Sequence, residues 1–270
     1  MTVTLADAGR VLVVGCGNMG GAMLGRWLAS GLDPARVTVV SPSGRAMSDG
    51  VRVVTAVPEA DDRFDTVVLA LKPQKLGELK STAFGAHAPR LLVSILAGVE
   101  EAEIAASCRA QAVVRAMPNL PVALGKGVTG LFSSTADDDA RRVAEALCAP
   151  LGYHEWIAEE RLFDAVTALS GSGPAFLFRF VDALARAGMA LGLPEDQAHR
   201  LALATVEGSA LMAAVADEAP AGLADRVASP GGSTREGLNV LDRDDALVRL
   251  LTRTLAASER RNRELAEAAR

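Results

Sequence analysis

The sequence predicts an α/β domain with a parallel sheet, followed by an all-α domain. In residues 1–158, short runs of Val, Leu and Ile alternate with segments that have helical periodicity. Such alternation is typical of βαβ units, whose strands are buried on both faces. In residues 159–270 the strand-like runs disappear, and long helices rich in Ala and Leu follow. We therefore place a domain boundary between residues 158 and 159, where composition shifts without a low-complexity linker.

The first apolar run, Val11–Val14, leads directly into a glycine-rich loop. The loop reads Gly15-Cys16-Gly17-Asn18-Met19-Gly20, and a helix candidate with Met23, Leu24 and Trp27 on one stripe follows it. Glycines at this spacing permit a tight turn, a close approach of backbone to a pyrophosphate, and close packing of helix on strand. The N-terminus of the helix adds free N–H groups and the positive end of its dipole. We predict a dinucleotide site here, with a merely structural turn as the alternative.

The composition argues against several classes of protein. A net charge of −5 does not favour a nucleic acid or an anionic membrane as a partner. Cys16, Cys108 and Cys148 are an odd number without a CxxC pair, so we expect reduced thiols, no metal site and a cytoplasmic protein. We expect no signal peptide and no membrane span, because the apolar runs are too short.

The second strand, Arg36–Val40, is followed by a turn that bears on the choice of cofactor. An NAD enzyme usually places Asp or Glu here to hold the ribose 2′-hydroxyl. This chain has Ser41-Pro42-Ser43-Gly44-Arg45 instead. Ser and Arg would bind a 2′-phosphate that a carboxylate would repel. We therefore predict NADPH as the cofactor, with NADH possible and an ordinary turn as the alternative.

Later apolar runs complete the sheet, at 66–71, 91–96, 112–116, 127–132 and 154–156. Turns rich in Pro or Gly follow the first three, and they read Lys72-Pro73-Gln74, Ala97-Gly98 and Met117-Pro118-Asn119-Leu120-Pro121. Since ligands of a doubly wound sheet bind beyond the carboxyl ends of its strands, these turns are expected to line one crevice. Lys72 is a candidate contact to phosphate or ribose, and a solvated loop lysine is the alternative.

Helices are expected at 137–148, 160–169, 174–191, 194–216, 238–241 and 245–268. Two loops in the helical half, Ser170–Pro174 and Ser229–Thr234, combine glycines with hydroxyls just before a helix. Each alone is explained by capping, but together they indicate a small carboxylate-bearing substrate held by backbone amides. Leu247, Leu250 and Leu251 lie on an apolar stripe that forms either intrachain core or an interface.

Five segments together resemble the motifs of the pyrroline-5-carboxylate reductase family, in its order and spacing. They are the glycine loop, Leu71-Lys72-Pro73-Gln74, Arg115-Ala116-Met117-Pro118-Asn119, Leu169-Ser170-Gly171-Ser172-Gly173-Pro174-Ala175 and Ser229-Pro230-Gly231-Gly232-Ser233-Thr234. The resemblance implies a Rossmann-like domain, a helical dimerisation domain, and homodimers that often assemble further. It also implies NAD(P)H-dependent reduction of the cyclic imino acid 1-pyrroline-5-carboxylate to L-proline, the last step of proline biosynthesis.

The resemblance and the motifs together nominate two sets of site residues. The expected cofactor-binding residues are Gly15, Gly17, Asn18, Met19, Gly20, Ser41, Ser43, Arg45, Ala70, Lys72, Pro73 and Asn119. The expected substrate-binding residues are Ser229, Gly231, Gly232, Ser233 and Thr234. Amides of Gly231, Gly232 and Ser233 would hold the carboxylate, and the Thr234 hydroxyl would bond to the ring nitrogen as the catalytic group.

The chain departs from the family pattern at a few positions. The family commonly has Thr at Leu120 and Gln at Ala204, and an apolar residue at Glu207. After the catalytic Thr it has Ile at Arg235, and a small residue or His at Glu236. These differences bear on substrate breadth and on loop packing, and they leave the reaction class intact.

Two other functions remain as alternatives. A β-hydroxyacid dehydrogenase shares this plan but needs a general acid or base, often a lysine, and every lysine lies at or before Lys126. A non-catalytic, oligomeric NADP-binding protein has no use for an anion-holding loop at Ser229–Thr234. A protonated imine arrives with its own proton, so the expected reductase needs mainly orientation of the two rings.

Overall fold

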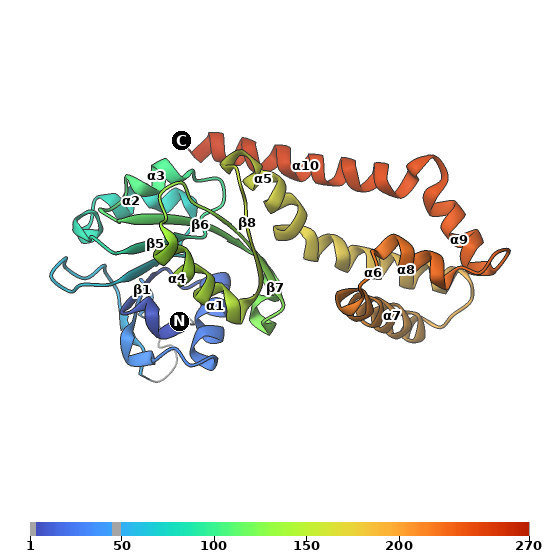
Figure 1. Cartoon of the computed structure of the whole chain (residues 1–270), viewed down its shortest axis with the longest axis horizontal. Helices are drawn as coiled ribbons and strands as arrows, with labels where there is room; N and C mark the ends of the chain where they lie inside the picture. Colours follow the sequence, from blue (N-terminus) through green and yellow to red (C-terminus); the bar gives the residue numbers. More distant parts are fainter. Residues whose placement is uncertain (1–3, 45–49, 270) are drawn as a thin grey trace. The chain divides into compact units, whose positions relative to one another are not determined.

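The computed structural model describes residues 4–44 and 50–269, which form two compact units (Figure 1). The first unit comprises Met1–Ser172 together with Ser258–Arg270, and the second comprises Gly173–Ala257. The C-terminal helix α10 (Ala246–Ala269) contributes to both units. These units are defined by contacts within the chain, whereas the boundary expected between residues 158 and 159 concerns composition and function. That boundary therefore stays a prediction.

A sheet forms the centre of the first unit, and the described residues contribute eight strands to it. The strands are β1 (Val11–Val14), β2 (Val37–Val40), β3 (Arg52–Val54), β4 (Thr66–Leu69), β5 (Leu91–Ser94), β6 (Ala112–Pro118), β7 (Gly127–Phe132) and β8 (Gly152–Trp156). Their order is β3-β2-β1-β4-β5-β6-β7-β8, and neighbours are parallel except for β6 and β7. The strand order reverses between β1 and β4, where doubly wound sheets bind their ligands. The predicted parallel architecture is confirmed.

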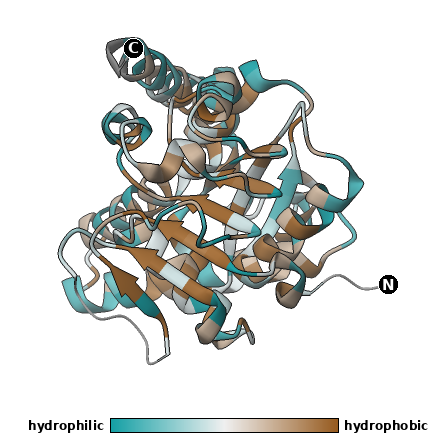
Figure 2. Ribbon diagram, turned by 90° about the vertical axis from the view of Figure 1, so that its left-hand side faces the viewer, coloured by the Kyte–Doolittle hydropathy of each residue, from teal (hydrophilic) through white to brown (hydrophobic). Residues whose placement is uncertain are grey.

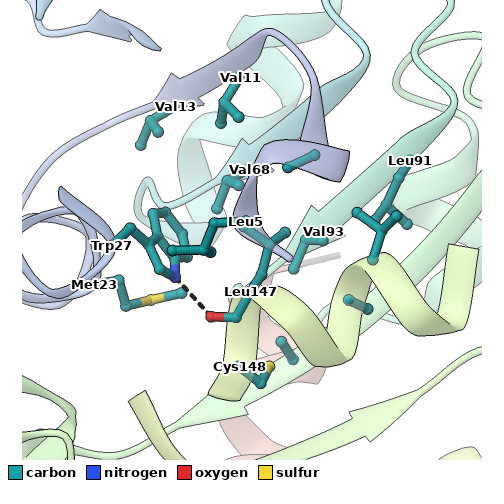
Figure 3. Close-up of a cluster of buried hydrophobic side chains, with 14 of the residues drawn as sticks. Leu5, Val11, Val13, Met23, Trp27, Val68, Leu91, Val93, Leu147 and Cys148 are labelled. Atoms are coloured by element: carbon teal, nitrogen blue, oxygen red, sulfur yellow. Dashed lines mark hydrogen bonds between the residues drawn. The ribbon is translucent and has the colours of Figure 1, made fainter. Parts of the chain in front are cut away.

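Helices cover both faces of this sheet, because successive strand residues point to opposite sides. The helices are α1 (Asn18–Ala29), α2 (Leu76–Lys80), α3 (Glu101–Ala105), α4 (Asp138–Cys148) and α5 (Phe163–Val166). Val13 packs in the cluster with α1 and α4, and Val14 packs in the cluster with α2 and α3. In the first cluster the Trp27 indole N–H donates to the Leu147 carbonyl at 2.6 Å (Figure 3). Figure 2 shows the central strands coloured as hydrophobic along most of their length.

The second unit is helical and buries little of its apolar surface. Its helices are α6 (Gly173–Ala190), α7 (Glu195–Val215), α8 (Pro220–Val227), α9 (Ser233–Asp242) and the first part of α10. The buried cluster that the described residues form here consists of Ala185, Ala198 and Ala202. Larger apolar side chains are exposed, with Phe178 at 61% and Val215 at 85%. Exposed apolar surface of this extent marks a protein–protein interface.

Some short elements differ from the expectation for identifiable reasons. β3, α2, α3 and α8 are not predicted, because each is too short to show a period. The helix expected at 160–169 is α5, continued by a π-helical turn at Thr167–Gly171 in which Ser172 N–H donates to the Thr167 carbonyl at 2.9 Å. The piece expected at 238–241 is the end of α9. No helix in the described ranges is both long enough and apolar enough to cross a membrane.

Candidate active site

The glycines of the loop after β1 are of two kinds: two lie too close to Ala70 to carry a side chain, and one faces open space. Gly15 has a φ of 86°, and a Cβ there would lie 2.7 Å from the Ala70 carbonyl oxygen. A Cβ at Gly20 would lie 2.9 Å from the Ala70 Cβ, so Ala70, the residue after β4, closes both positions to side chains. A Cβ at Gly17 would meet nothing within 4 Å. Gly17 therefore leaves open space on the ligand side, as a dinucleotide-binding loop requires.

The N-terminus of α1 is open to an anion. Its cap residue is Gly17, which offers no side chain to the first turn. The first helical hydrogen bond runs from the Gly21 N–H to the Gly17 carbonyl at 2.8 Å. The N–H groups of Asn18, Met19 and Gly20 precede it and have no partner inside the helix. The Met19 side chain packs against the core, so only its amide faces this end. These residues fit a pyrophosphate.

A cavity of about 690 Å³ adjoins the glycine loop. Its lining residues include Gly15, Gly17, Val40, Pro42, Ala70 and Lys72. It therefore lies at the carboxyl ends of β1, β2 and β4, on the β2 side of the point where the strand order reverses. Its size and its largely apolar lining suit the adenosine half of a dinucleotide.

The turn after β2 carries two hydroxyls, one on either side of Pro42, which lines this cavity. The Ser41 and Ser43 Oγ atoms lie 3.1 Å apart, and Ser41 is only 8% exposed. The turn is held by the Gly44 N–H, which donates to the Ser41 carbonyl at 2.9 Å. Arg45, the third residue expected to bind the 2′-phosphate, lies outside the described residues.

The loop after β4 contributes to two neighbouring cavities. The Ala70 N–H donates to the Val14 carbonyl at 2.9 Å, which keeps β1 and β4 paired up to the edge of the large cavity. Lys72 is exposed and lines that cavity. Pro73 lines a smaller second cavity. The structure thus gathers Gly15, Gly17, Ala70 and Lys72 around one space, and places Pro73 at the next.

Asn119 has a different environment from the other expected cofactor residues. It is 6% exposed, at the end of β6. Its Oδ1 accepts from the Val128 N–H at 2.8 Å, and its Nδ2 donates to the Ser170 carbonyl at 3.0 Å. Both ends of the amide are therefore engaged within the protein. This geometry fits a residue that holds the π-helical turn in place, a role that sequence reasoning missed.

In the helical unit, the loop Ser229–Gly232 forms a tight turn before α9. The Gly232 N–H donates to the Ser229 carbonyl at 2.9 Å, and Gly231 has a φ of 69°. With Pro230 at the second position, this is the pattern of a type II turn. The Gly232 N–H, which the sequence predicts to bind the substrate carboxylate, is therefore already engaged in a hydrogen bond within the turn. The open N–H groups of the first turn of α9 are those of Ser233, Thr234 and Arg235.

The Thr234 side chain is exposed and does not cap α9. The cap residue is Gly232, which has no side chain, so a hydroxyl cap is not what begins this helix. The next residue, Arg235, donates to the Asp225 carboxylate at 2.8 Å. Arg235 therefore ties the start of α9 to α8, which gives this departure from the family pattern a structural role.

The cysteines have no features of catalytic groups. Burial raises the pKa of the Cys16 thiol, which sits in the glycine loop. Burial also raises the pKa of Cys108 to about 11 and of Cys148 to about 12. A thiol is nucleophilic only as the thiolate, so these groups are inert near neutral pH. Across residues 4–44 and 50–269, no three His, Cys, Asp or Glu side chains gather as metal ligands.

The open glycine loop, the anion-holding turn of α1 and the adjoining cavity define a dinucleotide-binding α/β protein with a helical second part. Comparisons with known families agree. The family model described as NADP oxidoreductase coenzyme F420-dependent matches residues 10–98. The model described as pyrroline-5-carboxylate reductase dimerisation matches residues 160–265.

Individual relatives cover nearly the whole chain. A pyrroline-5-carboxylate reductase of Pseudomonas aeruginosa is 36% identical over 96% of this chain and 97% of its own. A solved structure of a pyrroline-5-carboxylate reductase from Coxiella burnetii has a TM-score of 0.84 and 32% identity, covering 96% of this chain and 98% of that one. A Plasmodium falciparum pyrroline carboxylate reductase with NADP bound shares the fold, with a TM-score of 0.78, 23% identity, and coverage of 96% and 99%. The chain belongs to the pyrroline-5-carboxylate reductase family.

Gly17→Ala should separate cofactor binding from folding. The new methyl enters open space and the φ of −75° suits alanine, so the melting temperature should stay near that of the wild type. The methyl would stand where the pyrophosphate approaches, and we expect NADPH affinity to fall at least about tenfold, by titration of NADPH fluorescence. Gly25→Ala is the matched control, because its methyl also meets nothing within 4 Å. Unchanged affinity in Gly17→Ala would contradict the assignment.

Asn119→Asp should make both stability and turnover depend on pH. The ionised carboxylate can still accept from Val128 but repels the Ser170 carbonyl, whereas the protonated acid donates to that carbonyl as the amide does. The buried acid should have a raised pKa, so both quantities should recover as pH falls from about 8 to about 5. Asn119→Leu should show no recovery. An increased KM for NADPH without pH recovery would instead favour direct contact with the cofactor.

Proposed function

We propose that this chain is an NAD(P)H-dependent oxidoreductase that reduces 1-pyrroline-5-carboxylate to L-proline, the last step of proline biosynthesis. The observation that carries the proposal is the presence, in one chain, of two helix termini that can hold anions. One is the open first turn of α1 beside Gly17, and the other is the first turn of α9. Similarity to pyrroline-5-carboxylate reductases over 96% of the chain supports it.

The chain's residues bind and orient the two reactants. When bound, NADPH supplies the hydride. The N–H groups of Asn18, Met19 and Gly20 bind the pyrophosphate at the positive end of the α1 dipole. The N–H groups of Ser233 and Thr234 bind the substrate carboxylate in the same way at α9. The turn at Ser229–Gly232 fixes the direction in which these amides point.

The reaction needs no proton donor from the helical unit. The protonated imine carries its own proton, and the Thr234 hydroxyl oxygen accepts from this ring N–H, which fixes the ring against rotation. The hydroxyl is exposed and not used in capping, so it is available for this bond. A β-hydroxyacid dehydrogenase needs a general acid or base, often a lysine, and the helical unit of this chain contains none because no lysine follows Lys126.

A homodimer through the helical unit is part of this proposal. On α10, Leu250 is 53% exposed and Leu251 is 46% exposed, so the apolar stripe expected there is not buried inside the chain. A second copy of the unit is the natural cover for such a surface. The three cysteines are an odd number without a CxxC pair, which suits a reducing compartment, so we place the enzyme in the cytoplasm.

The preference for NADPH rests on Ser41 and Ser43. Ser41→Asp would set a carboxylate beside the 2′-phosphate, and we expect the KM for NADPH to rise at least about tenfold while that for NADH changes little. Steady-state kinetics with both cofactors measures this. Ser41→Asn is the matched control, because it removes the hydroxyl without adding charge. Equal kinetic constants for the two cofactors in the wild type would refute the preference.

Thr234 tests the proposed chemistry. The wild type should oxidise NADPH, followed by absorbance, with 1-pyrroline-5-carboxylate and should not reduce NADP⁺ with a 3-hydroxy acid. Thr234→Ala should lower turnover by about a hundredfold, or ~3 kcal/mol, because it removes a hydrogen bond made best in the transition state. Its melting temperature should stay unchanged, since Gly232 caps the helix.

Two further variants sharpen this result. Thr234→Ser keeps the hydroxyl and should recover much of the rate. Thr252→Ala removes another exposed hydroxyl, one that bonds to the Val248 carbonyl on α10, and should leave turnover unchanged. Normal turnover in Thr234→Ala combined with a lower melting temperature would show that the hydroxyl is structural.

A further inference from the structure

A second cavity of about 220 Å³ lies beside the loops that follow β4 and β5 in the first unit. Its lining residues are Pro73, Gln74, Ala97, Gly98, Asp164, Thr167 and Asn262. The last of these is on α10, which approaches the loop closely: a Cβ at Gly98 would lie 3.0 Å from the Ala266 Cβ. The C-terminal turns of α10 thus wall a polar space at the carboxyl ends of two strands.

Two polar side chains that line this cavity, those of Asn262 and Asp164, are available to a ligand. The Nδ2 atom of Asn262 is buried and has no hydrogen-bond partner among the described residues. A buried donor without an acceptor destabilises the protein, so a ligand that supplies an acceptor gains affinity here. Asp164 also forms no hydrogen bond or ion pair within the described part of the chain. Burial raises the pKa of Asp164, against the opposing charges of Arg115 and Arg263.

The cavity lies where the second half of a dinucleotide is expected. A dinucleotide spans the point where strand order reverses, with one half on each side. The large cavity lies on the β2 side of that point, and the small one lies on the β5 side. Lys72 lines the first and Pro73 the second, so the two spaces meet at one loop. The smaller volume suits a fragment and not a whole dinucleotide.

We propose that Asn262 and Asp164 bind the carboxamide of the nicotinamide ring. The Asn262 Nδ2–H donates to the carboxamide oxygen, and the Asp164 carboxylate accepts from the carboxamide NH₂. A primary amide offers both an acceptor and a donor, which complement the Asn262 amide donor and the Asp164 carboxylate acceptor in the lining of this cavity. The two residues hold the ring and take no part in proton or hydride transfer. The inference rests on the proposed use of NAD(P)H.

Binding measurements without substrate test the assignment. Isothermal titration calorimetry would compare NADP⁺ with thio-NADP⁺, which has a weaker sulfur acceptor, and with the 3-acetylpyridine analogue, which lacks the NH₂. Adenosine 2′,5′-bisphosphate, which lacks the nicotinamide, is the fourth ligand. The wild type should bind each analogue about tenfold more weakly than NADP⁺.

Each variant should lose discrimination against one analogue only. Asn262→Ala should bind NADP⁺ about tenfold more weakly and no longer distinguish it from thio-NADP⁺, while still rejecting the acetylpyridine analogue. Asp164→Ala should show the reverse pattern. The isosteric variants Asn262→Leu and Asp164→Leu repeat the test without enlarging the cavity. Glu264→Gln, a change on α10 at an exposed residue that pairs with Arg261, should behave as the wild type.

Adenosine 2′,5′-bisphosphate decides whether a variant is folded. Equal affinity for it in all variants, with the pattern above, supports the proposal. Wild-type affinity of both pairs of variants for NADP⁺ would overturn it and indicate that water satisfies Asn262. Loss of affinity for the bisphosphate in parallel with NADP⁺ would also overturn it, in favour of a structural role. Since no imine is present, this outcome is independent of whether the enzyme reduces 1-pyrroline-5-carboxylate.

Discussion

The contact between the glycine loop and Ala70 constrains the rest of the first unit. The backbone of Ala70 lies so close to Gly15, and its side chain so close to Gly20, that neither position accepts a Cβ. This closeness brings the end of β1, the end of β4 and the start of α1 to one point. The open first turn of α1 and the two cavities on either side follow from that geometry.

A network of polar groups connects β6 and α3 with the residues that precede α5. One oxygen of Glu160 accepts from the Arg115 guanidinium at 2.7 Å and from the Glu101 N–H at 2.6 Å. The guanidinium carbon also lies 4.4 Å from the centre of the Phe163 ring. Because the Arg115 side chain is buried and loss of Glu160 would leave its charge uncompensated, this contact holds the residues that precede α5 against β6. Asp164 follows Phe163 directly, so this network also places the carboxylate that lines the small cavity.

The sequence predicts what depends on local patterns and misses what depends on distant partners. Four-residue apolar runs such as Val11–Val14 predict the sheet, and the spacing of Gly15, Gly17 and Gly20 predicts the dinucleotide site. By contrast, the partners of Asn119 lie at Val128 and Ser170, and nothing near Asn119 in the chain identifies them. The hydrogen bond from the Gly232 N–H to the Ser229 carbonyl joins residues that are close in sequence. It is nevertheless not predicted, because glycine-rich loops adopt many conformations and the residue pattern alone does not select the turn.

The helical unit connects substrate binding with assembly. Its buried core consists of small alanines, while residues such as Phe178 and Leu211 remain exposed. Hydrophobic burial is the main favourable contribution to folding, so we expect a unit that buries so little to gain rigidity when the proposed dimer covers its apolar surface. The carboxylate site that we propose at the start of α9 lies on this unit, where the Arg235–Asp225 pair links α9 to α8. Because an ion pair of this kind is weak on its own, we expect packing against a second copy to stabilise the turn at Ser229–Gly232, which sets the direction of the Ser233 and Thr234 amides.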